Sequence, residues 1–207
     1  MFTTYTFYVY YVYMSRDRIF AAAKAVLDRE GVSNFTVRKV ADHAGLSPMA
    51  MYRHFADKEA LLDALVNDGL AAWERIAQSI GASDPIEWLT ALGEAFLEFA
   101  LREPHRFDAA FFLPAPGARQ YPDDFVAGRS PVVAMAMMRI EQAKAEGRLG
   151  EKPALEVALA FSGLAQGLIS MYRANRFSSE KQFKTLYRTQ IRHCLEGFAK
   201  KPSGRAR

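Results

Sequence analysis

Apolar side chains recur at intervals of three and four residues from Ser15 to Gly31, the spacing of one face of a helix. Ser15 is a favourable N-cap, and Gly31 is a favourable C-terminal stop. The pattern therefore predicts a first helix between these two residues. Its apolar face consists of Ile19, Phe20, Ala23, Val26 and Leu27.

Two short helices are predicted next, on either side of Gly45. Thr36 is a favourable N-cap for the first, which ends at this glycine. Ser47 and Pro48 begin the second, because the first helical position has no use for the N–H that proline lacks. It extends to about His54. The sequence thus predicts two helices joined by a tight turn.

A fourth helix is predicted to begin after Asp57, whose carboxylate suits the positive end of a helix dipole, and to continue towards Ile80. In the preceding segments, several apolar residues have the spacing of core positions. We assign these residues to packing: Val40, Ala41, Leu46, Met51 and Phe55.

Beyond the boundary segment from Gly81 to Pro85, the predicted helices are longer and richer in aromatic residues. A Pro/Gly-rich loop is expected from Leu113 to Asp124. The helix from Pro153 to Arg173 is apolar nearly all round, so we expect it to be buried on more than one side. The other helices are expected up to Pro104, from Phe125 to Glu146, and from Ser179 to Ala199.

The whole pattern predicts an all-α protein with two domains. A three-helix helix-turn-helix domain is expected at 14–73, with its motif at 36–55, and a larger helical domain at 82–200. The basic segment 201–207 reads as a tail.

The first thirteen residues, "MFTTYTFYVYYVY", carry no charge and are rich in aromatic and β-branched types. They are too short to span a membrane and lack the basic leader and cleavage site of an export signal. Their composition resembles that of an exposed, aggregation-prone strand. We therefore interpret 1–13 as an extension that lies upstream of the true start, with Met14 as that start. The alternative, that 1–13 belongs to the native protein, stays open.

Composition adds little to this picture. The 207 residues carry a formal net charge of +4, which favours an anionic partner only weakly. The single cysteine, Cys194, cannot form an intramolecular disulfide, and we expect a reducing cytoplasm. The four histidines are scattered, and neither a phosphate-binding loop nor a metal-ligand spacing occurs. We therefore expect no enzyme, catalytic residue, cofactor or metal.

The third predicted helix points to a function. It begins with small residues, which allow a helix to enter the major groove of DNA, and continues with hydroxyl, imidazole and cationic groups that can reach phosphates. The stretch "FTVRKVADHAGLSPMAMYRHFADKEALL" resembles the DNA-binding domain of the tetracycline-repressor (TetR/AcrR) family, over about Ser15 to Trp73. The resemblance implies a dimeric regulator, most simply a repressor, whose third helices enter the major grooves of a palindromic operator.

The same resemblance implies roles for individual residues. Arg53 fits either a phosphate or a base contact, and Tyr52 has the alternative of a partly buried core position. Phosphate contacts are implied for Thr36, Tyr52, His54 and Lys58. Base contacts are implied for Arg38, Ser47, Pro48, Met49 and Ala50. Between Ser15 and Asp63, eight basic residues face seven acidic ones, so a few placed contacts must carry DNA affinity.

In the family, the C-terminal helices bind a small molecule that releases DNA, and the last two helices form the dimer. A largely apolar effector is therefore implied, next to Phe96, Phe99, Phe107, Phe111, Met135, Met138 and Phe161. The alternative for each is an ordinary core position. Glu94, Glu98, Asp108 and Gln166 could orient a polar group or face water.

For the dimer, Ala158, Ser162, Gly163 and Gly167 allow close helix approach, and the apolar stripe from Phe183 to Phe198 needs a cover. The fourth helix joins the two domains and would couple them. An activator, or a nucleic-acid protein without an effector, remains an alternative to the repressor.

Overall fold

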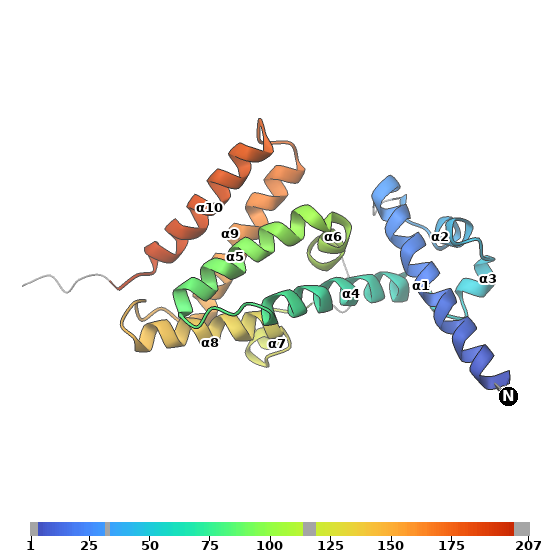
Figure 1. The fold of residues 1–207 in the computed structure, drawn as a ribbon, viewed down its shortest axis with the longest axis horizontal. Helices are drawn as coiled ribbons and strands as arrows, with labels where there is room; N and C mark the ends of the chain where they lie inside the picture. Colours follow the sequence, from blue (N-terminus) through green and yellow to red (C-terminus); the bar gives the residue numbers. More distant parts are fainter. Residues whose placement is uncertain (1–3, 32–33, 114–118, 201–207) are drawn as a thin grey trace, which may run out of the picture. The chain divides into compact units, whose positions relative to one another are not determined.

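The computed structural model describes residues 4–31, 34–113 and 119–200, which form ten helices and no strand (Figure 1). The all-α prediction is confirmed. The described residues form two compact units, and the chain passes between them more than once. The first unit contains the residues up to Leu70 and those from Glu103 to Leu113. The second contains 71–102 and 119–200.

The first unit is built around helices α1 to α3, drawn in blue in Figure 1. Its further elements are the first part of α4 and the whole of α6. Their bounds are α1 Thr4–Glu30, α2 Val37–Ala44, α3 Pro48–Met51, α4 Lys58–Gln78 and α6 Pro104–Phe112. The core of this unit includes Ile19, Phe35, Val40, Met51 and Leu61, all with 0% exposure.

Three predicted N-caps are confirmed in this unit. The Thr36 hydroxyl accepts a hydrogen bond from the Lys39 N–H at 3.3 Å, and the Ser47 hydroxyl accepts one from the Ala50 N–H at 3.2 Å. The Asp57 carboxylate accepts from the Ala60 N–H at 2.7 Å. These bonds satisfy N–H groups that have no helical partner, so the starts of α2, α3 and α4 are locally encoded.

The first helix begins earlier than predicted, at Thr4 instead of Ser15. Ser15 therefore lies inside α1 and is not its N-cap. Extending an existing helix avoids the cost of nucleation, so residues 4 to 14 can continue the helix despite their strand-like composition. Residues 1–3 of the predicted extension and the tail 201–207 lie outside the described residues.

Two other predicted helices also have different bounds. The third helix ends as an α-helix at Met51, and residues 52 to 54 continue it as a turn. The helix predicted from Phe125 to Glu146 is interrupted, because Gly128 adopts a φ of 71° and Pro131 starts a new helix. The segment therefore forms α7 Asp123–Val126 and α8 Pro131–Ala145.

The second unit consists of the last part of α4 and the helices α5, α7, α8, α9 and α10. The Asp84 side chain accepts hydrogen bonds from the Ile86 and Glu87 N–H groups, both at 2.9 Å, so the predicted boundary segment also caps the start of α5. The remaining bounds are α5 Pro85–Arg102, α9 Ala154–Arg173 and α10 Glu180–Gly197.

Helices α5, α9 and α10 come close together at Gly93. A Cβ atom at this position would lie 2.9 Å from Cγ2 of Ile191 and 3.1 Å from Cζ of Phe161. The buried Tyr187 hydroxyl donates a hydrogen bond to the Gly93 carbonyl at 2.9 Å, and burial raises the pKa of Tyr187 above its ordinary value. Only a residue without a side chain fits at this crossing.

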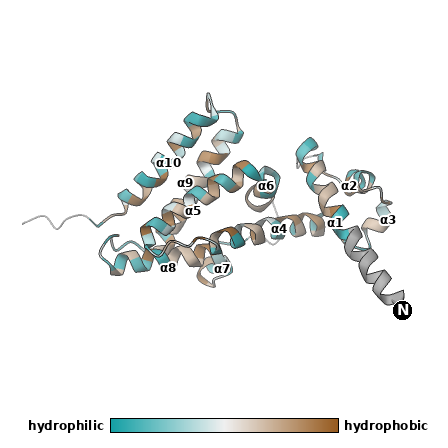
Figure 2. Cartoon of the chain, viewed as in Figure 1, coloured by the Kyte–Doolittle hydropathy of each residue, from teal (hydrophilic) through white to brown (hydrophobic). Residues whose placement is uncertain are grey.

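Helix α9 is buried on more than one side, as predicted, because α5, α8 and α10 all pack against it. Figure 2 shows how apolar its sequence is. By length and composition alone it could cross a membrane. Of the 18-residue apolar window that meets this criterion, 39% is buried inside the protein. A core helix of a soluble protein passes the same test, so this property is weak support for a membrane span.

The apolar stripe on α10 was predicted to need a partner as its cover, and four of its members are covered within the chain instead. Its members Phe183, Tyr187, Ile191 and Leu195 are buried within the chain, at 0 to 5% exposure, and Ala158 on α9 is also buried. Phe183 stacks on Tyr172 of α9, with ring centroids 4.3 Å apart. The packing of α9 and α10 on α5 covers these four residues, whereas Leu186 of the same stripe is 39% exposed.

Helix α6 lies in the first unit, whereas the sequence assigned it to the domain 82–200. Ala109 is 4% exposed and belongs to the core of the first unit. A Cβ atom on Gly69 of α4 would lie 2.6 Å from the Arg106 carbonyl oxygen and 2.9 Å from Cβ of Ala110. This glycine allows α6 to approach the backbone of α4 closely, and the contact joins residues that are far apart in sequence.

Candidate functional site

The predicted DNA-reading segment surrounds a tight turn between α2 and α3. Gly45 adopts the left-handed conformation, with φ 64° and ψ 37°, and its N–H donates to the carbonyls at the end of α2. The Leu46 N–H donates to the Ala41 carbonyl at 2.9 Å. This is the hydrogen-bonding pattern of a glycine helix stop, and two residues later Ser47 caps α3.

None of the residues predicted to touch DNA is buried. Met49 is 72% exposed and Tyr52 is 51% exposed, so Tyr52 is not the core residue of the alternative interpretation. Ala50, His54 and Lys58 are partly exposed. The remaining members of the set are exposed: Thr36, Arg38, Ser47, Pro48 and Arg53.

The apolar residues assigned to packing have the opposite environment. Met51 has 0% exposure and Phe55 has 7%, and Leu46 packs against the same core while partly exposed. Val40 and Ala41 of α2 are also fully buried. Buried and exposed residues therefore alternate along α3 and its flanks, so one side is held in the core and the other faces solvent.

The cations of this unit differ in what they can offer to a phosphate. Lys39 forms an ion pair with Glu30 of α1, and its Nζ also donates to the Asn34 carbonyl at 3.2 Å. Among the described residues, Arg38, Arg53 and Lys58 take part in no ion pair. These three side chains can neutralise phosphates without first losing an intramolecular partner.

A hollow of about 340 Å³ lies between α1 and α2. Its lining carries both signs of charge and includes the paired Lys39 and Glu30. Arg29, Asp42, His43 and the apolar Val26 complete it. Because the charges offset one another, the hollow favours neither an anion nor a cation.

A second cluster of charges joins three helices of the first unit. The carboxylate of Asp68 on α4 lies 2.9 Å from Nε of Arg106 on α6 and 3.2 Å from Nζ of Lys24 on α1. Nearby, His105 of α6 pairs with Asp28 of α1. No local sequence pattern indicates these pairs, because their members are separated by many residues and lie on different helices.

The predicted effector residues are divided between the two units. Phe96 and Phe99 lie in the second unit, and both pack against Trp73, with ring centroids 5.1 and 6.1 Å from it. Phe107 and Phe111 lie in the first unit, 4.8 Å apart. Trp73 was not among the predicted effector residues, although it packs against two of them.

The other members of the predicted effector set lie in the second unit. Phe161 is buried at 5% exposure, next to Gly93. Met135 is half-buried, whereas Met138 is 60% exposed and lies outside the buried aromatic group.

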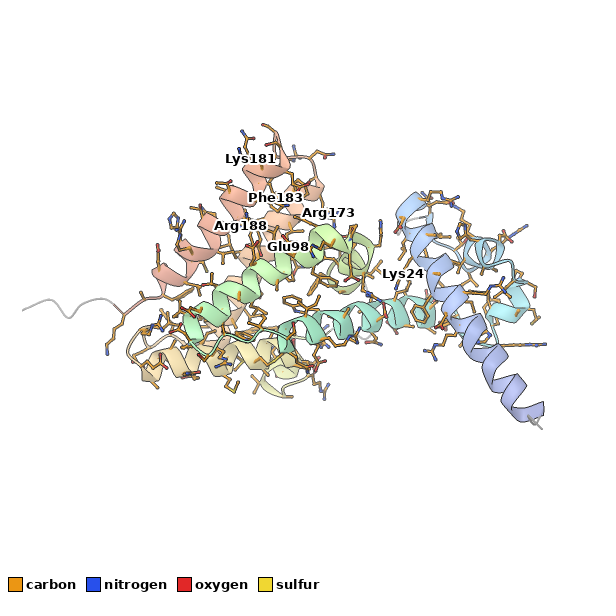
Figure 3. All side chains as sticks on the ribbon, viewed as in Figure 1. Lys24, Glu98, Arg173, Lys181, Phe183 and Arg188 are labelled. Atoms are coloured by element: carbon orange, nitrogen blue, oxygen red, sulfur yellow. The ribbon has the colours of Figure 1, made fainter. Side chains whose placement is uncertain are left out.

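Two of the acidic residues considered as polar contacts for an effector, Glu94 and Glu98, form ion pairs within the protein. Glu94 on α5 pairs with Arg188 on α10, with one bond of 2.9 Å from Nε, and Glu98 pairs with Arg102 at 2.8 Å. Figure 3 shows Glu98 on α5 and Arg188 with Phe183 on α10. The Glu94–Arg188 pair joins α10 to α5, whereas the Glu98–Arg102 pair lies within α5. On the same helix, burial raises the pKa of the Cys194 thiol, which keeps it protonated.

Both halves of the chain match known protein families. Residues 19–65 match "Bacterial regulatory proteins, tetR family", and residues 89–194 match "Tetracyclin repressor-like, C-terminal domain". The two matches cover the helix-turn-helix segment and most of the second unit.

Individual relatives agree with these matches. The chain is 38% identical over 76 residues to the tetracycline repressor protein class A from transposon 1721 of Escherichia coli, which covers 37% of the chain and about a third (34%) of that repressor. It is 21% identical over 185 residues to the uncharacterized HTH-type transcriptional regulator YobS of Bacillus subtilis, which covers 89% of the chain and 92% of the regulator.

Solved structures show the same fold. A protein of unknown function from Rhodococcus sp. RHA1 superposes with a TM-score of 0.70 at 26% identity, over 89% of this chain and 95% of that one. A putative tetR family transcription regulator from Shewanella sp. PV-4 has a TM-score of 0.68 at 19% identity, over 90% and 99%. The chain therefore belongs to the tetR family of bacterial regulatory proteins, which are DNA-binding transcription factors and not enzymes.

Proposed function

We propose that this regulator is a homodimeric repressor that binds a palindromic operator and leaves it when a small, largely apolar effector binds. The observation that carries the proposal is the exposed face around α3, where Met49 and Tyr52 project while Met51 and Phe55 are buried. Several relatives are named as repressors, among them the tetracycline repressor class A of Escherichia coli and the repressor KstR2 of Mycolicibacterium smegmatis. We place the protein in the cytoplasm, where it meets DNA.

Within this face, the base-reading role falls to Arg38 and to the exposed start of α3. An arginine can donate two hydrogen bonds to guanine, and the apolar Pro48, Met49 and Ala50 can pack on thymine methyl groups. Ser47 is engaged as the N-cap of α3, and its hydroxyl can also accept from or donate to a base edge. These side chains would set sequence preference.

The phosphate-contacting role falls to residues at the ends of the two short helices. Thr36 lies at the start of α2, and Lys58 begins α4. Tyr52 and His54 follow α3 in the turn before α4. Hydroxyl, imidazole and ammonium groups here would fix the register of the protein on DNA without reading its sequence, and Arg53 can serve either role.

Dimerisation is proposed through α9 and α10, with the predicted residues Gly163 and Gly167 of α9 at the interface. Since four members of the apolar stripe of α10 are buried inside the chain, the available surface is the solvent-exposed side of these helices. On α9 this side carries the small residues Ala160, Gly163, Gly167 and Ser170. A Cβ atom on Gly163 or Gly167 would meet nothing within 4 Å, so a second helix has room to approach.

The effector is proposed to bind in the second unit, near the aromatic group of Trp73, Phe96 and Phe99. Buried aromatic side chains favour a ligand with a large apolar surface. Release of DNA requires that the effector bind more tightly to a state in which the recognition helices are misplaced. Helix α4 contributes residues to both units and is therefore the proposed coupling element.

Selection of bound duplexes from a random pool tests the proposal. We expect an enriched site with two inverted half-sites about one helical turn apart, at about 34 to 36 Å. Arg38→Ala is expected to lower affinity for this operator by about 1–3 kcal/mol and to relax sequence preference. Lys58→Ala is expected to weaken binding to all duplexes and to reduce the slope of log K against log salt by about one.

The two variants serve as controls for each other. If Arg38→Ala reduced affinity for operator and random duplex equally, its base-reading role would be wrong. If no site were enriched by the wild-type protein, the proposal of operator recognition would fail as a whole.

A further inference from the structure

The recognition helix α3 has only one α-helical turn, Pro48–Met51, so its own hydrogen bonds cannot fix its direction. Its direction therefore depends on the packing of Met51 in the core and on the contacts of its flanks. Two arginines of α1, Arg16 and Arg18, reach the two flanks, and neither was given a role by the sequence analysis beyond a contribution to net charge.

Arg18 holds the flank that precedes α3. Its Nη2 donates a hydrogen bond to the Ala44 carbonyl at 2.7 Å, in a part-buried position. Ala44 is the last residue of α2, and the carbonyls of Ala41 and Asp42 already accept from the Gly45 N–H. Arg18 therefore donates to a carbonyl at the end of α2 that the Gly45 N–H does not reach.

The contact also restricts the turn itself. A Cβ atom on Gly45 would lie 3.3 Å from Nη2 of Arg18, closer than most side chains come. The absence of a side chain at Gly45 thus serves two needs, the left-handed backbone and the approach of the guanidinium group. Because Ser47 follows two residues later, this bond holds the turn that leads into α3.

Arg16 holds the flank that follows α3. Its guanidinium carbon lies 5.8 Å from the ring centroid of Phe55 and 5.9 Å from that of Phe20. The two rings meet edge to face, with centroids 5.9 Å apart. A cation over an aromatic face at this distance is attracted by the ring quadrupole. Phe55 is buried, so the contact ties the end of the recognition segment to α1.

We propose that Arg18, with Arg16 in support, is a positioning residue for operator recognition: it fixes the recognition helix on α1 and does not act as a phosphate contact. The proposal rests on the proposed operator binding for its affinity readout. Its structural part, the clamp on the turn, can be tested without DNA.

A positioning residue and a phosphate contact differ in their effect on salt dependence. Removal of a phosphate contact eliminates the release of one counterion, which lowers the salt slope by about 0.9 and weakens all duplexes alike. Loss of the clamp leaves the cationic phosphate contact Lys58, at the start of α4, in place and misdirects α3. The operator then loses affinity, and random DNA, which uses no base contacts, does not.

Arg18→Met and Arg18→Lys form a matched pair for the test. Methionine keeps an unbranched chain without a donor, whereas lysine keeps a cationic donor that can reach the Ala44 carbonyl. For Arg18→Met we expect about a tenfold loss of operator affinity, comparable to one lost hydrogen bond to a charged group. We expect random-duplex affinity to stay within about twofold, with an unchanged salt slope. Arg18→Lys is expected to recover most of the operator affinity.

Hydrogen exchange of the DNA-free protein supplies the second measurement. Arg18→Met is expected to accelerate amide exchange from Leu46 to Phe55, while exchange in α9 and α10 stays at the wild-type rate and Arg18→Lys resembles the wild type. Unchanged exchange in this segment would overturn the clamp even if wild-type protein selected no operator.

Two other outcomes would also overturn the proposal. A salt slope lowered by about one, with equal losses on operator and random DNA, would make Arg18 a phosphate contact. Exchange accelerated throughout the first unit, with Arg18→Lys as damaged as Arg18→Met, would make Arg18 a general stabilising residue. Arg16→Gln is expected to follow Arg18→Met in direction, with a smaller loss of operator affinity.

Discussion

Single residues of the first unit differ in role even where they share a charge. Lys39 is paired with Glu30, and Arg18 donates to the Ala44 carbonyl, so neither cation is available in the way that Arg38 is. The charge count between Ser15 and Asp63 treats them alike. The structure therefore leaves still fewer cations for DNA than the sequence suggested, and each placed contact matters more.

Asp68 of this unit forms ion pairs with two cations, Arg106 and Lys24. Partial burial alone would raise the pKa of its carboxyl group, but hydrogen bonds and charge from Arg106 and Lys24 outweigh this effect and lower the pKa. The unfolded chain has an ordinary Asp pKa of about 3.9. A lowered folded pKa means that the stabilisation is present above that value and is lost as the pH falls through the folded pKa.

Asp68→Asn is therefore expected to reduce the free energy of unfolding at pH 7. The free energy of unfolding of the variant is also expected to fall less between pH 5 and pH 2 than that of the wild type, because the carboxylate with the lowered pKa is absent. Urea unfolding of the wild type and the variant at several pH values measures both effects. Asp63→Asn, on the same helix but outside any described ion pair, is the control and is expected to retain the wild-type pH dependence.

Asp28 contributes with the opposite sign. Burial raises the pKa of its carboxyl group, although the paired His105 lowers it in part, so this group favours folding at low pH. The comparison of Asp68→Asn with wild type cancels the Asp28 contribution, because Asp28 is present in both proteins. An acid dependence identical in the two proteins would show that the Asp68 ion pairs do not stabilise the fold.

Among the elements, α6 departs most from the sequence prediction. Its core residue Ala109, its ion pair to Asp68 and its close crossing at Gly69 all join it to the first unit. The sequence placed it in the domain 82–200 because it follows α5 along the chain. The alternation of apolar residues predicts that a helix has a buried face but cannot say which helices that face packs against.

Gly69→Ala is expected to destabilise the protein by about 1–3 kcal/mol, because the added methyl group overpacks the crossing of α4 with α6. The nearest atom belongs to the backbone at Arg106 and cannot rotate away. Chemical denaturation of both variants measures the effect. Gly197→Ala, at the exposed end of α10 where a Cβ meets nothing within 4 Å, is the control and is expected to change stability little. Equal stability of the two variants would contradict the close crossing.

The boundary between α7 and α8 is marked in the sequence by a glycine and a proline, although the segment was predicted as one helix. Gly128 and Pro131 stand inside the segment predicted as one helix, and both residues end or begin helices. The apolar run "VVAMAMM" dominated the pattern and concealed the break. The early start of α1 at Thr4 is a different case, because a preceding segment of strand-like composition gave no sign that it would extend a helix.

At the scale of the molecule, the proposed function requires two copies of the chain. A two-fold axis would present two recognition segments to successive major grooves, and each copy would add its own phosphate contacts. With so few available cations in one copy, a dimer is also what raises affinity on a palindromic site. The proposed dimer depends on the exposed side of α9 that carries Gly163 and Gly167.

The double variant Gly163→Leu/Gly167→Leu is expected to block close helix approach and to shift the protein towards monomer at micromolar concentration. Sedimentation equilibrium measures the change, and operator affinity is expected to fall with it. Ala145→Leu, at the exposed end of α8, adds the same kind of side chain elsewhere and is expected to leave the dimer intact. A wild-type protein that is itself monomeric under these conditions would contradict the proposed dimer.

The sequence by itself determined the features that depend on neighbours along the chain. The caps at Thr36, Ser47 and Asp57 and the glycine stop at Gly45 act within one helical turn, and they define the helix-turn-helix segment. The division of α3 into buried Met51 and exposed Met49 and Tyr52 follows from helical spacing in the same way.

Only the tertiary structure decided what these elements contact. The reach of Arg18 to Ala44, the ion pairs of Asp68, the membership of α6 in the first unit and the intramolecular cover of the α10 stripe all join residues that are distant in sequence. Such contacts depend on which faces pack together and on how closely, as at Gly69 and Gly93. A periodic pattern shows that a helix has a face to bury, whereas the three-dimensional packing selects its partner.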